Sequence, residues 1–182
     1  MLKLLSANRI RLKKSKLFWG GLFVTIGYSM FLLLMNYMEK ASYIGNSIMQ
    51  INWYLLSPFS VISFFCPIFS SIFIGTEYND GTMRNRLIVG HTRTNIYLAN
   101  FITVCGANII ITLISSIIIM IFGTLMLGWS MINPVLFLLH YISGIMMLIA
   151  FTGFFTLVAM VLSNKTASTV TCIVSFLLSY MV

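Results

Sequence analysis

The sequence predicts an all-α, polytopic transmembrane helical bundle, and three observations lead to that fold class. Of the 182 residues, 59% are hydrophobic and only 8% are charged, whereas a soluble domain is about 45–50% apolar and about 25% charged. The mean hydropathy is +1.00. Five apolar runs also approach or exceed the roughly 20 residues that a helix needs to cross a hydrocarbon core.

The five runs define the expected crossings. They cover residues 17–36, 56–75, 96–124, 135–162 and 166–182. The first is longer than the apolar core of a cleavable signal peptide, which has about 7–15 residues. The third is longer than the hydrocarbon thickness requires, so we expect it to tilt or protrude. No charged or aromatic anchor follows the fifth, which suggests that this span is truncated.

Basic residues orient these spans. Six of the 11 Lys and Arg residues precede the first span, three lie between the second and third, and Lys165 lies between the fourth and fifth. Short loops rich in Lys and Arg stay in the cytoplasm, so we expect a cytoplasmic N-terminus. Residues 1–16 lie beside a transmembrane run, which favours a basic interfacial segment on anionic lipid over a nucleic-acid arm. They carry only a loose apolar stripe.

The composition argues against catalysis by this chain. Its acids are Glu39, Glu77 and Asp80, too few for most hydrolytic sites, which need paired acids and bases or an activated nucleophile. The three cysteines lie singly in apolar runs, so we expect packing residues and no metal or redox site. A Gly-rich phosphate loop is also missing from the sequence.

Polar residues concentrate in residues 76–95, between the second and third spans. Gly81 permits a bend, Thr82 can cap a new helix, and Gly90 can end it after about eight residues. Met83, Leu87 and Ile88 would then share one side of an amphipathic unit. An ordinary basic loop that only fixes topology is the alternative interpretation.

The segment resembles the exit from the second span and the coupling helix of ABC-2-type permeases. Their pattern has Glu, three residues, Gly-Thr, an aliphatic residue and Arg, then a Ser/Thr-Arg pair before the next span. The matching residues are Glu77, Gly81, Thr82, Met83, Arg84, Thr92 and Arg93. Members usually have six spans, so we expect this sequence to lack the C-terminal part of such a permease.

The resemblance implies partners and roles. Permeases of this kind pair with a second permease subunit, identical or different, and with separate ATPase subunits, so ATP and Mg would be bound by the partner and no cofactor by this chain. Residues expected to contact the ATPase are Thr82, Met83, Arg84, Arg86, Leu87 and Ile88, where the arginines would pair with partner acids or lipid phosphates. Glu77 would brace the coupling helix by pairing with Arg84 or Arg93, together with Gly81 and Thr92.

Two polar side chains inside the spans are candidates for a translocation path. His140 lies early in the fourth span, and an ionisable group at membrane depth suggests function. Asn108 lies within the third span, where a hydrogen bond between helices is the commoner role.

The leading hypothesis is therefore a non-catalytic permease subunit in a bacterial cell membrane, exporting a drug-like, peptide or lipidic substrate. An ATP-independent small channel or toxin-immunity protein is the alternative. An intramembrane enzyme acting on lipids is disfavoured because the acids and His140 fall at different depths.

Overall fold

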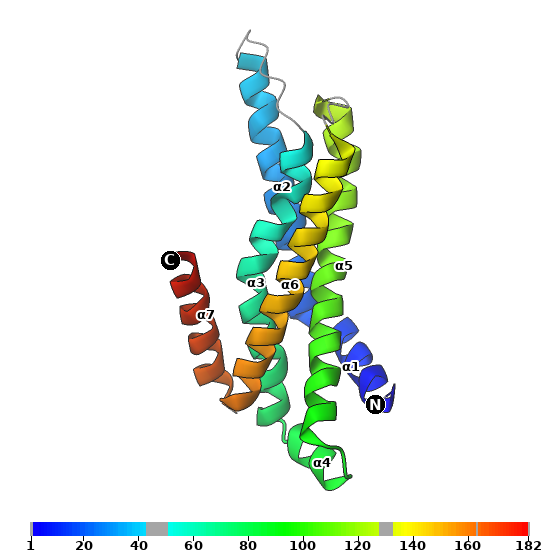
Figure 1. The fold of residues 1–182 in the computed structure, drawn as a ribbon, viewed down its shortest axis with the longest axis vertical. Helices are drawn as coiled ribbons and strands as arrows, with labels where there is room; N and C mark the ends of the chain where they lie inside the picture. Colours follow the sequence, from blue (N-terminus) through cyan, green and yellow to red (C-terminus); the bar gives the residue numbers. More distant parts are fainter. Residues whose placement is uncertain (1, 43–50, 128–132, 163, 182) are drawn as a thin grey trace.

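The computed structural model describes residues 2–42, 51–127, 133–162 and 164–181. The ends of two expected segments, residues 1 and 182, lie outside them. The described part is helical throughout its elements (Figure 1), with bounds α1 Leu2–Lys14, α2 Lys16–Ser42, α3 Ile51–Asn79, α4 Thr82–Ile88, α5 Arg93–Leu127, α6 Pro134–Val161 and α7 Lys165–Met181.

Four of these helices, α2, α3, α5 and α6, are long and apolar enough to cross a membrane. The predicted all-α polytopic bundle is therefore confirmed. The fifth expected span corresponds to α7, which has 17 residues. At 1.5 Å per residue it is about 25 Å long, which is less than a hydrocarbon core of about 30 Å.

The N-terminal segment is more ordered than its loose apolar stripe suggests. It forms α1, which packs against α5. Leu4, Asn8 and Leu12 are buried at four-residue spacing, whereas Ile10 is 59% exposed. A polar residue in the middle of the buried stripe weakens the amphipathic pattern in the sequence, and the neighbouring helices supply the partners for that residue.

One end of the bundle collects the basic segments. Figure 1 places α1, α4, the C-terminal end of α6 and the start of α7 at the same end, which we call the basic end. The Lys and Arg residues that precede the first span, lie in and beside α4, or begin α7 therefore share this end. This arrangement agrees with the alternation of basic loops in the sequence.

The helix α3 is central to the bundle, because α2, α5, α6 and α7 all pack against it. Its approach to α7 is close enough that a Cβ on Gly75 would lie 2.8 Å from the Cα of Lys165. One cluster of the core contains Phe69, Phe73 and Ile74 of α3 with Val104 of α5. This packing fixes the end of α3 that carries Glu77.

Candidate functional site

The short helix α4 is bounded by two glycines in the left-handed region. Gly81 has φ +66° and Gly90 has φ +93°, conformations that favour glycine. At the C-terminal end the N–H of His91 donates to Arg86 O at 3.1 Å and that of Gly90 to Leu87 O at 3.0 Å. These two bonds form a Schellman motif, so Gly90 ends the helix as expected.

The expected cap at the start of α4 was wrong. Gly81 occupies the N-cap position, and Thr82 is the first helical residue. The Thr82 hydroxyl donates instead to the backbone oxygen of Glu77 at 3.1 Å, which ties the start of α4 to the end of α3. Thr92 does cap the following helix, because Asn95 N–H donates to its hydroxyl at 3.4 Å.

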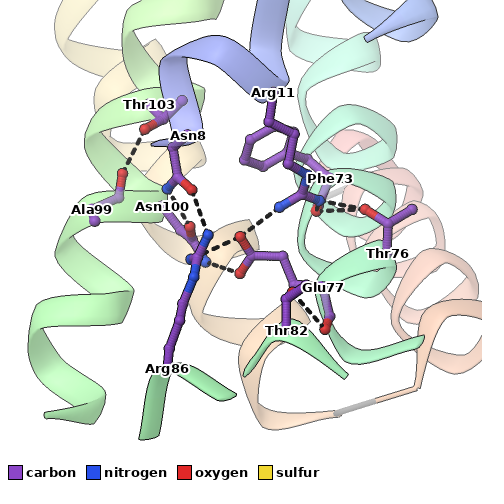
Figure 2. Close-up of polar contacts among 10 residues, drawn as sticks. All are labelled: Asn8, Arg11, Phe73, Thr76, Glu77, Thr82, Arg86, Ala99, Asn100 and Thr103. Carbon is purple, nitrogen blue, oxygen red and sulfur yellow. Dashed lines mark hydrogen bonds and ion pairs between the residues drawn. The ribbon is translucent and has the colours of Figure 1, made fainter. Parts of the chain in front are cut away.

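Glu77, in the last turn of α3, is the centre of the site. Its side chain is fully buried, and its Oε1 forms ion pairs with Arg11 of α1 and Arg86 of α4 (Figure 2). The distance from Arg86 Nη1 to Oε1 is 2.9 Å. One carboxylate thus joins the consecutive helices α3 and α4 to the distant helix α1.

Two buried asparagines complete a ring around this carboxylate. Asn100 of α5 donates to Glu77 Oε2 at 2.8 Å, and Asn8 of α1 donates to Asn100 Oδ1 at 2.7 Å. Arg86 closes the ring by donating to Asn8 Oδ1 at 2.9 Å. Buried polar groups need hydrogen-bond partners, and the members of this ring supply those partners to one another. We call Asn8, Arg11, Glu77, Arg86 and Asn100 the Glu77 network.

Arg11 is held by more than its ion pair. Its Nη2 donates to the backbone oxygen of Phe73 and to the Thr76 hydroxyl, and its guanidinium lies 4.2 Å from the centroid of the Phe73 ring. Burial lowers the pKa of Arg11, while the Glu77 carboxylate opposes that shift. An arginine remains charged at physiological pH even so, and the network carries two positive charges against one negative.

The expected partners of Glu77 were wrong. Arg84 and Arg93 are exposed, and the cations on Glu77 are Arg11 and Arg86. Successive helical residues turn by about 100°, so Arg86 lies beside Met83 on the inward face of α4, whereas Arg84 points away. Gly81 contributes to the placement of α4 through its backbone conformation.

The expected ATPase contacts divide into two groups. Met83 is 5% exposed and packs with Leu4, Ile96 and Ala99, and Arg86 belongs to the Glu77 network, so these two side chains point into the chain. The exposed ones are Thr82, Arg84, Leu87 and Ile88. The inward pair anchors α4, and the outward group remains accessible.

Sequence reasoning missed Asn8, Arg11 and Asn100. Asn8 lies in the stripe Leu4, Asn8 and Leu12, where an amide between two leucines at helical spacing signals a buried polar contact. Arg11 was counted only among the topology-setting cations. Asn100 lies one helical turn after Ile96 in α5, and nothing in its local sequence indicates a carboxylate partner.

The two intramembrane candidates occupy different environments. Asn108 is fully buried, and its Nδ2 lies 3.3 Å from Cys66 Sγ and 3.5 Å from Thr152 Oγ1, linking α5 to α3 and α6. His140 is exposed on α6, and its Nδ1 lies 2.7 Å from Leu136 O of its own helix. Asn108 therefore has the helix-linking contacts, while His140 faces away from the bundle.

The architecture defines a class of protein: a polytopic helical membrane protein with a short helix fixed beyond one end of its spans. The family model for ABC-2 family transporter proteins matches residues 4–182. The chain belongs to this family and is a permease of an ABC transporter, a transport subunit embedded in a membrane. No curated protein and no solved structure matches it.

Proposed function

We propose that this permease is driven by a separate ATPase subunit that binds the exposed side of α4. The observation that carries the proposal is an apolar tip formed by Leu87, Ile88 and Val89, which are 39%, 82% and 76% exposed. Figure 1 places α4 beyond the ends of the spanning helices at the basic end. Clustered apolar side chains exposed outside the spans are typical of a protein–protein contact.

The inward side of α4 supports a role in transmitting force. Arg86 connects α4 to the Glu77 network, and Met83 packs against α1 and α5. A push on the tip would therefore reach α1, α3 and α5 together through buried contacts. A helix of seven residues is not stable alone, so α4 depends on these inward contacts. A tip on a loosely attached loop would lack such a connection to the other helices.

Further properties belong to the same proposal. The partner would bind ATP and Mg, and two permease subunits would form the complete membrane part in a bacterial cell membrane. Exposed apolar residues of α2, α5 and α6 such as Phe31, Met120 and Met146 suit an exported drug-like, peptide or lipidic cargo. Asn108 and His140 remain candidates for contact with that cargo, His140 from the outward face of α6.

The test is co-purification of the tagged chain from its native cells in mild detergent, with mass spectrometry and an assay of ATP hydrolysis. We expect an ATP-binding subunit with the wild-type chain and its loss with Ile88→Asp. Asn85→Asp is the matched control, because it adds one carboxylate to an exposed position of the same helix.

Two results would contradict the proposal. If no ATPase co-purified with the wild type, the ATP-independent channel or toxin-immunity alternative would replace it. If Asn85→Asp and Ile88→Asp released the ATPase equally, the tip would not be the contact.

A further inference from the structure

A large groove opens at the basic end between α4, the start of α5 and the end of α6. Its volume is about 1030 Å³, at the upper end of the roughly 300–1,000 Å³ of pockets that bind small molecules. Met83, Arg84 and Leu87 of α4 line it, and no member of the Glu77 network is among its lining residues. The groove shares Leu87 with the tip of α4, whereas Arg84, Arg93 and the end of α6 line the part of it that lies outside the tip.

The charge of the groove has one sign. Arg84 of α4 and Arg93 of α5 both line it, both are exposed, and the lining residues include no Asp or Glu. Neither arginine contributes to the ion pairs of Glu77, which are made by Arg11 and Arg86. The groove therefore offers two guanidinium groups, which bind phosphate oxygens by paired hydrogen bonds.

The opposite wall is apolar and comes from a spanning helix. Leu157, Met160 and Val161 belong to the last two turns of α6 and line the groove, and Leu157 and Val161 are 51% and 73% exposed. Beside them the Tyr97 hydroxyl donates to Gly153 O at 3.1 Å, which fixes α5 to α6. Apolar side chains thus lie next to two cations where the spans end.

We propose that the groove binds an anionic phospholipid of the leaflet at the basic end. The phosphate would lie against Arg84 and Arg93, and the acyl chains would run along Leu157 and Val161. Basic pockets between helix ends at a membrane surface bind such head groups. A soluble phosphate would use the arginines and leave the apolar wall uncovered, so the combination favours a lipid. The bound lipid would link α4 to α6.

Native mass spectrometry of the full chain in detergent tests the proposal. The probes are phosphatidylglycerol and phosphatidylcholine with identical acyl chains, added in separate titrations. We expect tighter binding of phosphatidylglycerol by the wild type and a loss of roughly 30-fold in Arg84→Ala/Arg93→Ala, from a factor of about five per arginine. The matched control, Arg9→Ala/Lys13→Ala, removes two exposed cations of α1 and should bind like the wild type.

A second variant separates groove occupancy from charge. Thr94→Trp places a large side chain in the groove at an exposed residue and keeps both arginines; it should also weaken phosphatidylglycerol binding. Equal binding of the two lipids, equal losses in both double variants, or displacement of the lipid by millimolar inorganic phosphate alone would overturn the proposal. So would a change from dimer to monomer in Thr94→Trp, which would assign the groove to a second copy.

Discussion

Arg86 Nη1 of α4 lies 2.9 Å from Glu77 Oε1 of α3, and the Glu77 side chain is fully buried. The chain turns between these residues at Gly81, whose φ is +66°. The ion pair therefore closes the link between a spanning helix and the short helix beyond its end. Arg11 reaches the same oxygen from α1, so the position of α4 depends on a residue more than 60 positions earlier.

Glu77→Gln should destabilise the protein strongly. The substitution keeps the shape and the bond to Asn100 in reach, but it leaves two guanidinium groups without their carboxylate. Removing one partner of a buried ion pair costs about 3–5 kcal/mol. Thermal unfolding in mild detergent, followed by circular dichroism, should show a clear fall in the midpoint. An unchanged midpoint would mean that water or lipid satisfies the arginines.

Arg86→Met and Arg84→Met form a matched pair on one helix. Arg86→Met removes an ion pair and leaves Asn8 Oδ1 without its hydrogen-bond donor. This loss should lower the free energy of unfolding by about 1–3 kcal/mol. Arg84 is exposed and has no role in the network, so its substitution should stay within about 0.5 kcal/mol of the wild type. The same thermal measurement ranks them. Equal effects of the two substitutions would mean that the contacts of Arg86 do not stabilise the protein.

Gly75→Ala should loosen α7 from α3. A Cβ at this position would lie 2.8 Å from the backbone Cα of Lys165, and backbone cannot move aside as a flexible side chain can. Overpacking of this kind typically costs about 1–3 kcal/mol. Gly106→Ala is the control, because nothing lies within 4 Å of its added Cβ. Alanine there should be neutral or stabilising, and equal losses in both variants would argue against the close contact.

Gly90→Val should disturb the end of α4 more than Gly90→Asn. The residue has φ +93°, which a β-branched side chain resists and asparagine tolerates better. Nothing lies within 4 Å of an added Cβ, so the difference would come from the backbone alone. Protease cleavage after Arg86 should be faster in the valine variant. Similar cleavage rates in the two variants would indicate that the turn accommodates valine without loss of stability.

Much of the fold could be predicted from the sequence because it depends on local properties. Long apolar runs give α2, α3, α5 and α6, and glycines 81 and 90 mark the limits of α4. The length of α3 could not be read in the same way, since it extends to Ile51 and Asn79 beyond the apolar run of residues 56–75. At its C-terminal end Thr76, Glu77 and Tyr78 continue the helix, because their side chains find partners in Arg11 and in the backbone of α6.

The candidate site could be predicted only in part. The motif identified Glu77 as important, but proximity in sequence favoured Arg84 and Arg93 as its partners. The observed partner Arg11 lies in a segment whose many cations are equivalent by composition, and only the packing of α1 on α5 selects it. Similarly, grouping Met83 with Ile88 ignored that five helical residues span about 500°, which puts them on different faces.

The most direct test of the account is whether Glu77 holds α4 against α1. Spin labels at Ala7 and Asn85, both exposed, would report the distance between the two helices by double electron–electron resonance in a background without the native cysteines. We predict one narrow distance distribution for the wild type and a broad or displaced one for Glu77→Gln, with Arg84→Met like the wild type. The same narrow distribution in Glu77→Gln would contradict the account.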